Sequence, residues 1–155
     1  MKKLLLIRGA PGSGKTTLAK RLKHEARKGG LSVFHVEADD FFTNNKNEYR
    51  YAPERLHQAH NWCKRKVASH VGFSDMVIVA NCFTYGDHLA PYVEMGLRAG
   101  VEVELIECTN KFENVHDVPN DVVDRMRANA DTASVLEKRF PEVKFRNKTH
   151  FGDIP

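Results

Sequence analysis

The residues with the clearest chemical meaning form one glycine-rich segment near the start of the chain: Gly9, Ala10, Pro11, Gly12, Ser13, Gly14, Lys15, Thr16 and Thr17. Glycines allow the backbone to curl tightly, so that several N–H groups can point at one anion. Lys15 would supply a positive charge for the β- and γ-phosphates, and the Thr16 hydroxyl is placed to ligate Mg²⁺. The segment therefore predicts a phosphate-binding loop for ATP or GTP.

The residues on either side of this segment fit a loop between a strand and a helix. Residues 3–8 contain an apolar run that predicts a buried strand. Residues 16–28 place apolar side chains on one helical face, and two glycines follow them. A helix that starts at the loop would add the positive end of its dipole to the phosphate site. Both flanks favour a nucleotide-binding loop over a glycine turn without a ligand.

A pair of carboxylates, Asp39 and Asp40, directly follows the next predicted strand at residues 31–37. Ligands of an open α/β sheet lie outside the carboxyl ends of the strands, so both side chains should border the same crevice as Lys15. A carboxylate in that crevice can accept the proton of an attacking hydroxyl, as phosphoryl transfer to an alcohol requires. The alternative is that the pair only begins a turn.

The remaining pattern alternates strands with helices along the whole chain. This alternation predicts an α/β fold of the P-loop NTPase type, nucleotide-kinase-like, with a parallel sheet of four to five strands flanked by helices. We expect one domain over 1–155, with a kinase core at about 2–131 and a basic tail at 138–155. Further strands are predicted at 76–80, 101–107 and, at the edge, 143–146, and further helices at 53–71, 87–99 and 119–130.

The composition is that of an ordinary globular domain. The chain has 155 residues, of which 41% are hydrophobic and 28% charged. Lys plus Arg number 24 and Asp plus Glu number 20, so the formal net charge is +4. This mild basic excess, part of it at 64–66 and in the tail, is compatible with nucleic acid and equally with a solvated surface.

The cysteines and the hydropathy bear on the compartment. Cys63, Cys82 and Cys108 lie far apart, which argues against a disulfide framework or a zinc site and favours a reducing cytoplasm. No apolar run approaches the ~20 residues that a membrane span needs. We expect a cytoplasmic protein, in the host cytoplasm if it is viral, without a membrane partner. The sequence leaves its oligomeric state open.

Several stretches resemble a known group of enzymes. Residues 4–17 are followed, after the second predicted strand, by Asp39-Asp40-Phe41, and residues 51–53 lead into a helix with Ala59-His60-Asn61-Trp62. Pro91-Tyr92 and residues 118–122 fit the same pattern. With these residues the chain resembles the phage polynucleotide kinases and the small kinase-like and zeta-toxin-like ATP-binding domains related to them, over roughly residues 2–131.

The resemblance implies a kinase that uses ATP and Mg²⁺ to phosphorylate 5′-hydroxyl ends of nucleic acid. It implies that Lys15 and Thr16 hold phosphate and Mg²⁺, and that Asp39 is the general base that activates the acceptor hydroxyl. The residues expected on the acceptor side are Asp40, Phe42, Asn81 and Arg125.

Two departures from those kinases concern the acceptor side. Many relatives carry an Asp at the end of the third strand, where this chain has Ala80 followed by Asn81. Phage polynucleotide kinases carry an Arg that grips the acceptor phosphate three residues after the base, where this chain has Phe42. The resemblance with these departures predicts a different acceptor or a weak activity.

A third departure concerns the lid that closes over the transferred phosphate. The lid arginines of those kinases are replaced by Lys111, Phe112 and Glu113, so that only Lys111, Arg125 or Arg127 could lend the transition state a positive charge. Such a charge matters because arginine fingers change rates by ~10³–10⁵.

Two smaller patterns have simpler interpretations. His57 and His60 share a helical face but have no further ligands spaced for a metal ion. Glu102, Glu104 and Glu107 alternate with apolar residues, and we expect them on the exposed side of a strand.

A group of aromatic residues near the presumed acceptor side could stack on a base or pack a lid and the core. Its members are Phe41, Phe42, Tyr49, Tyr51 and Trp62.

Three functions agree with these observations. The first is an ATP-dependent kinase for a hydroxyl of nucleic acid, DNA rather than RNA, either a 5′-hydroxyl end or a hydroxymethyl group on a modified pyrimidine such as hydroxymethyluracil in phage DNA. The second is a kinase for a nucleoside, nucleotide or other small molecule. The third is an ATP-binding module without catalytic activity.

Overall fold

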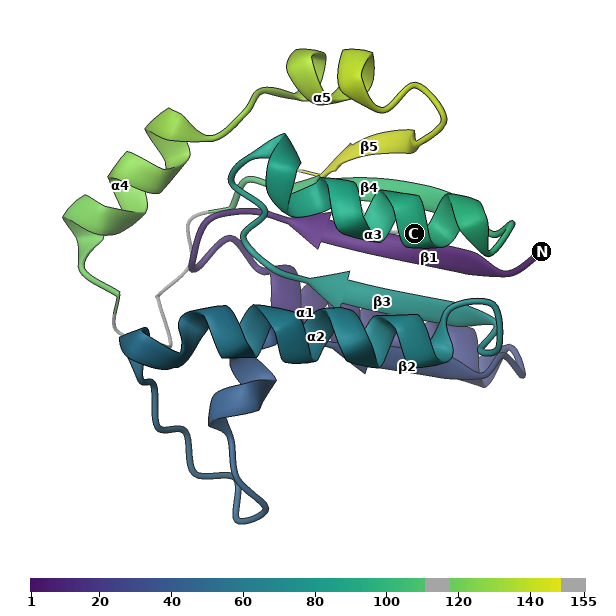
Figure 1. Cartoon of the computed structure of the whole chain (residues 1–155), viewed down its shortest axis with the longest axis horizontal. Coiled ribbons are helices and arrows are strands. Elements are labelled where there is room, and N and C mark those ends of the chain that lie inside the picture. The colour runs from purple at the N-terminus through teal and green to yellow at the C-terminus, as the bar shows by residue number, and fades with distance from the viewer. Residues whose placement is uncertain (111–117, 149–155) are drawn as a thin grey trace.

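The computed structural model describes residues 1–110 and 118–148. Within these residues, five parallel strands form one sheet in the order β2-β3-β1-β4-β5 (Figure 1). The strands are β1 (Lys3–Arg8), β2 (Val33–Val36), β3 (Met76–Ala80), β4 (Glu102–Cys108) and β5 (Lys144–Lys148). The α-helices are α1 (Lys15–Lys28), α2 (Leu56–His70), α3 (Gly86–Arg98), α4 (Asn120–Asn129) and α5 (Ala133–Arg139). The predicted α/β fold with a parallel sheet is confirmed.

The central strand β1 is apolar along its whole length because both of its neighbours and both faces cover it. Its residues pair in parallel register with β3 on one side and β4 on the other, for example Leu5 with Ile78 and with Glu104. Leu4, Leu6 and Ile7 are fully buried. A near-continuous apolar run is what a parallel strand buried on both faces requires.

Helices cover the two faces of the sheet. Helix α1 packs Leu18 and Ala19 against one face, and α2 and α3 cover the other, as Figure 1 shows with α1 behind the sheet and α2 and α3 in front of it. On α2, Ala59, Cys63 and Val67 recur every four residues and are all fully buried, which gives this helix one core-facing stripe.

All strands point the same way, toward the left of Figure 1. The loop between β1 and α1, the short 3-10 helix η1 (Ala38–Phe42) and the helix α4 all lie at that end. Parallel topology therefore gathers segments that are far apart in the sequence at one edge of the sheet.

The segment between β2 and α2 is more ordered than the loop that the sequence predicts. After η1 the chain turns back through an isolated antiparallel bridge between Thr43 and Tyr49. A second 3-10 turn, η2 (Pro53–Arg55), then leads into α2, with proline at its first position, where its missing N–H costs no hydrogen bond.

One prediction about the surface is wrong. Glu104 on β4 has no exposed side-chain area, although we expected it on the exposed side of the strand. Its carboxylate forms an ion pair with Lys3 Nζ at 3.0 Å and accepts a hydrogen bond from Arg146 Nε. The strands β1 and β5 flank β4, so their long side chains fold over this carboxylate and shield it from water.

The helix α5 is absent from the sequence-based prediction. It is only seven residues long, too short to show a reliable helical period. Its start carries a recognisable signal, because Thr132 Oγ1 accepts a hydrogen bond from the backbone N–H of Val135 at 3.3 Å. The helix buries Leu136 against the sheet face that α2 and α3 cover.

Candidate functional site

The glycine-rich segment forms a tight loop that leads directly into α1. A Cβ atom on Gly9 would lie 2.6 Å from the carbonyl oxygen of Cys108, so the end of β4 leaves room only for glycine. Gly14 has φ 93°, a left-handed conformation that favours glycine, and it immediately precedes the helix. Lys15 folds back over the loop and donates a hydrogen bond from Nζ to the carbonyl oxygen of Ala10 at 3.1 Å. The loop has the shape that a phosphate group requires at a helix N-terminus.

The hydroxyl of Thr16 is held by a carboxylate that sequence reasoning did not identify. Thr16 Oγ1 donates a hydrogen bond to Glu37 Oε1 at 2.6 Å. The other oxygen, Glu37 Oε2, lies 2.7 Å from His35 Nε2. Glu37 is 7% exposed and follows the last residue of β2, which places its side chain beside the loop. A buried, hydrogen-bonded carboxylate thus fixes the rotamer of the threonine that the sequence assigns to Mg²⁺.

The two aspartates after β2 have different surroundings. Asp40 Oδ2 accepts a hydrogen bond from the N–H of Glu37 at 3.0 Å, and burial raises the pKa of the Asp40 carboxyl above its ordinary 3.8. Asn81 Oδ1 accepts a hydrogen bond from the N–H of Ala38 at 2.8 Å and so ties η1 to the end of β3. With this turn held on both sides, Asp39 is left facing the adjoining cavity.

A cavity of about 1120 Å³ lies at the carboxyl ends of the strands. The predicted residues Lys15, Thr16 and Asp39 all line it, together with Asn81. Pro11, Gly12, Gly14 and Thr17 line it as well, and the helices α2, α3 and α4 supply the remaining walls. The structure therefore brings the predicted phosphate loop and the predicted base to one cavity.

The aromatic residues of this region divide between the core and the cavity. Phe42, expected on the acceptor side, is 6% exposed and packs edge-on against Phe41 and Tyr51. Tyr49 and Tyr51 instead line the cavity and lie parallel to each other, with ring centroids 6.5 Å apart and an interplanar angle of 9°. The Tyr49 hydroxyl donates a hydrogen bond to Asp39 Oδ1 at 3.4 Å. The tyrosines, and not Phe42, therefore lie where an acceptor could touch them.

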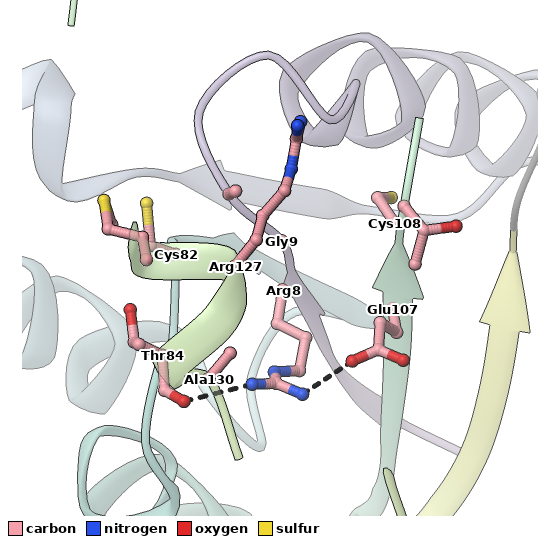
Figure 2. A pocket seen from close by; sticks show the side chains of 11 residues that line it. Arg8, Gly9, Cys82, Thr84, Glu107, Cys108, Arg127 and Ala130 are labelled. Carbon is pink, nitrogen blue, oxygen red and sulfur yellow. Dashed lines mark hydrogen bonds and ion pairs between the residues drawn. The ribbon is translucent and has the colours of Figure 1, made fainter. Parts of the chain in front are cut away.

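A second cavity of about 280 Å³ adjoins the start of the loop. Figure 2 shows it between the end of β1, the end of β4 and the helix α4, with the Arg127 side chain above it. Gly9, Ala10 and Cys108 line this cavity, and Cys82 lines both cavities. The two cavities therefore meet at the residues that follow β3.

Arg8 holds the wall between these cavities. Its guanidinium pairs with Glu107 Oε1 at 2.6 Å and donates hydrogen bonds to the carbonyl oxygens of Asp131, Phe83 and Thr84 at 2.9, 3.1 and 3.2 Å. Figure 2 shows this side chain reaching from β1 to Thr84 and Glu107. Phe83 has φ 46°, a conformation that bulky residues rarely adopt, and the bond from Arg8 to its carbonyl helps to fix it.

The remaining predicted charges fall outside the two cavities or outside the described residues. Arg125 is exposed on α4 and pairs with Asp121 one turn away at 3.3 Å, so the structure does not bring it to the acceptor side. The lid positions Lys111, Phe112 and Glu113 lie outside the described residues. Within residues 1–110 and 118–148, no three His, Cys, Asp or Glu side chains are grouped closely enough to hold a metal ion by themselves.

Two of these functional residues could have been found in the sequence. Glu37 stands two positions before Asp39 at the end of an apolar strand, a Glu-x-Asp spacing that puts both carboxylates at the same sheet edge. Arg8 is the last residue of an apolar run and the first before the glycines. A charge buried at such a position needs several hydrogen-bond acceptors, which signals that other segments converge on it.

Comparison with known proteins agrees with this geometry. An uncharacterized protein of Pasteurella multocida is 29% identical over 135 residues, which cover 81% of this chain and 75% of that protein. The human NEDD4-binding protein 2 is also 29% identical over 135 residues, covering 79% of this chain but only 7% of the human protein. The match to the human protein is thus confined to a small part of it.

Among solved structures, the APS kinase of Mycobacterium tuberculosis in complex with AMPPNP and APS superposes with a TM-score of 0.56. The identity is 16%, and the match covers 84% of this chain and 76% of that one. At this identity the likeness shows the fold alone, which is a P-loop kinase-like fold. The narrower resemblance to phage polynucleotide kinases stays a prediction.

The described part of the chain contains no helix long and apolar enough to cross a membrane. A family model described as "AAA domain" matches residues 4–116, which include the glycine-rich loop, the aspartates after β2 and the end of β3. Because this match spans most of the sequence, the chain belongs to the AAA domain family.

Proposed function

We propose that the protein is a kinase that transfers the γ-phosphate of ATP, with Mg²⁺, to a hydroxyl group of nucleic acid. The observation that carries this proposal is the position of Asp39 in the same cavity as Lys15 and Thr16. A loop for the phosphates and a carboxylate that faces them are the two parts that phosphoryl transfer to an alcohol needs.

The donor nucleotide would extend from the loop into the smaller cavity. The phosphates would lie at Lys15 and the N-terminus of α1, and the base beside Cys108 and Arg127. A volume of about 280 Å³, at the lower end of the range typical of small-molecule pockets, suits one heterocycle and not a whole nucleotide. Because the cavities meet at Cys82, the phosphate chain can pass from one to the other.

The oxygen atoms around Thr16 fit Mg²⁺. This ion prefers hard oxygen ligands and keeps several waters, so one hydroxyl with a carboxylate behind it is a sufficient protein contribution. Thr16 would contact the ion, and Glu37, 2.6 Å from the Thr16 hydroxyl, would orient that hydroxyl and accept hydrogen bonds from bound water. When bound, the ion would neutralise charge on the phosphates.

The side chains of the cavity then perform the transfer. Asp39 accepts the proton of the acceptor hydroxyl, and the acceptor oxygen forms a bond to the γ-phosphorus. The bond from that phosphorus to the β–γ bridging oxygen breaks, and ADP leaves. The Tyr49 hydroxyl, 3.4 Å from Asp39 Oδ1, holds the carboxylate in position.

The acceptor in this proposal is a 5′-hydroxyl end or a hydroxymethyl group on a modified pyrimidine. The size of the larger cavity, about 1120 Å³, and the two tyrosines at its wall support an acceptor that contains an aromatic base. The same observations also allow a free nucleoside, which is the alternative function. Salt separates the two, because binding to DNA weakens steeply with salt while nucleoside binding barely responds.

The test uses ATP labelled on the γ-phosphate with three acceptors: 5′-hydroxyl oligonucleotides, duplex DNA that contains hydroxymethyluracil, and free nucleosides. Label on either nucleic acid is the expected result, and label on nucleosides alone would replace the proposal by the alternative. Asp39→Asn should abolish transfer and leave ATP affinity intact, while Asp124→Asn, an exposed carboxylate on α4, should change neither. ATP binding without transfer to any acceptor would indicate a nucleotide-binding module.

A further inference from the structure

One stripe of α2 faces the larger cavity with polar side chains. Leu56, His60 and Lys64 are spaced four residues apart and all line the cavity. The neighbouring Arg65 and Lys66 are exposed and do not line it. The basic cluster at 64–66, which the sequence suggests is a solvated helix face, therefore contains one member with a different environment.

The positive charge of Lys64 is not neutralised by the carboxylates nearby. Within residues 1–110 and 118–148, no carboxylate forms an ion pair with Lys64. Asp87, which lines the same cavity from α3, pairs with Arg139 at 2.7 Å. Glu37 is held by Thr16. An ammonium group thus faces the cavity without a counter-charge of its own.

Two histidines lie near Lys64 on the cavity wall. His60 is one helical turn before it on α2, and His88 lines the cavity from the first turn of α3. Burial lowers the pKa of His60, and the positive charges of His88, Lys64 and His57 lower it further, while Asp39 acts in the opposite direction. Three groups that can be positive therefore repel one another until an anion lies among them.

Building on the proposed function, we propose that Lys64, His60 and His88 bind a phosphate ester that the acceptor carries next to its reacting hydroxyl. In this arrangement they take the part of the missing phosphate-gripping arginine, for which Phe42, buried in the core, cannot substitute. The acceptor is accordingly a nucleotide unit, either alone or at the end of a strand, and not an uncharged nucleoside.

The arrangement of the cavity supports this assignment. Lys15 enters it from α1 and Lys64 from α2, helices that cover opposite faces of the sheet (Figure 1). Asp39 lies close enough to His60 to influence its charge. The reacting hydroxyl at Asp39 and a phosphate at His60 and Lys64 would therefore belong to the same nucleotide, with the donor phosphates at the other side of the hydroxyl.

The test compares acceptors that differ only in the phosphate. Thymidine, thymidine 3′-monophosphate and a 5′-hydroxyl oligothymidylate present the same sugar hydroxyl, and steady-state kinetics give KM for each. We expect KM to be about 10- to 100-fold lower for the two phosphorylated acceptors, since a charge-assisted hydrogen bond contributes about 1.5–3 kcal/mol. Comparable KM values for these two acceptors indicate that a single nucleotide fills the site, and a lower value for the strand indicates further contacts.

Variants identify the residues. Lys64→Ala should remove most of this difference by raising KM for the phosphorylated acceptors while leaving KM for thymidine unchanged, and Lys64→Arg should restore it. Arg65→Ala is the matched control on the same helix and should behave like the wild type. The preference for phosphorylated acceptors should fall as the pH rises through neutrality, because His60 and His88 lose their protons, and His60→Gln should flatten that dependence.

Binding without turnover separates this inference from the proposed function. Equilibrium binding of thymidine 3′-monophosphate should weaken about 10-fold or more in Lys64→Ala and stay unchanged in Arg65→Ala. Equal binding to both variants, or equal KM for thymidine and its 3′-phosphate, would overturn the inference even if the protein phosphorylates nucleosides. If no acceptor is phosphorylated but Lys64→Ala still loses nucleotide binding, the proposed function fails and the phosphate site stands.

Discussion

The hydroxyl of Thr16 and the carboxylate of Glu37 are joined by a hydrogen bond of 2.6 Å across the space between the phosphate loop and the end of β2. The carboxylate is in turn held by His35, 2.7 Å away. This chain reaches the loop threonine from β2, whereas the resemblance predicted a carboxylate at the end of β3, where Ala80 stands. The negative charge near the expected Mg²⁺ position is thus present, but it comes from a different strand.

Glu37→Gln should weaken the response to Mg²⁺. The amide keeps the shape and can still contact Thr16, but it removes the charge behind the metal-binding hydroxyl, and changes of this kind typically cost about 10- to 100-fold in metal affinity or activity. Titrating Mg²⁺ at fixed ATP measures the effect. Glu48→Gln, which alters an exposed carboxylate in the turn after η1, is the control and should leave the titration unchanged. An unchanged titration in Glu37→Gln would assign Glu37 to loop structure alone.

Tyr51→Ala should raise KM for any acceptor that contains a base. Stacking of a base on an aromatic ring contributes about 1–3 kcal/mol, so the expected increase is about five- to 150-fold. The comparison variant is Phe73→Ala, because Phe73 is the most exposed aromatic ring of the described residues, at 78%, and does not line the cavity. A thermal melt of each variant shows whether the fold is kept. Equal KM values for the two variants would mean that acceptors do not stack on this tyrosine.

Cys82 should report occupancy of the donor site. It lines both cavities and is only partly exposed, whereas Cys63 and Cys108 are buried. A maleimide should therefore label Cys82 alone, more quickly as the pH rises, because burial raises the pKa of this thiol above 9.0 and only the thiolate reacts. ATP should block labelling, as intact-mass spectrometry would show. Undiminished labelling at saturating ATP would move the nucleotide away from the junction of the cavities.

Glu104→Gln should destabilise the protein in a pH-dependent way. Although burial alone raises the pKa of this carboxyl, the bonds from Arg146 and Lys3 outweigh burial and hold it below 4.5. The ionised group therefore stabilises the fold above that value, and this contribution is lost as the pH falls through the lower pKa of the folded state.

At pH 7 the Glu104→Gln substitution should reduce the free energy of unfolding by about 1–3 kcal/mol, since charged hydrogen bonds are lost but Lys3 and Arg146 can reach water. Urea unfolding of both proteins at pH 7 and pH 4 measures this difference, which should shrink at the lower pH. Glu102→Gln, on the same strand and without such bonds among the described residues, should cost less. A difference that is constant with pH would contradict the role of the ionised carboxylate.

The sequence predicted the regular elements well where burial is complete. The apolar runs at 3–8 and 76–80 coincide with β1 and β3, because a parallel strand covered on both faces leaves no polar position to blur its ends. The helix α5 escaped notice because seven residues contain barely two turns. Glu104 was misplaced because alternation identifies a face of the sheet but not the lysine and arginine stems that cover it.

The site was predictable on the donor side and only partly on the acceptor side. The glycine loop dictates its own shape through local backbone conformation, so its residues could be named in advance. The acceptor wall instead depends on how α2 rotates about its axis, and a rotation that buries Cys63 is what turns Lys64, and not Lys66, toward the cavity. Likewise, the packing of Phe42 into the core depends on contacts with Phe41 and Tyr51 that no periodicity specifies.

Arg8 also determines when the protein can become competent during its synthesis. The acceptors of its side chain lie 75, 76, 99 and 123 residues further along the chain, at Phe83, Thr84, Glu107 and Asp131. A nascent chain emerges from the ribosome N-terminus first, so the phosphate loop appears early while the last partner of Arg8 appears only when most of the chain has been made. Contacts between such distant residues also close slowly. The loop that carries the nucleotide is therefore among the first segments to be translated, and the wall that separates its two cavities is among the last to be completed.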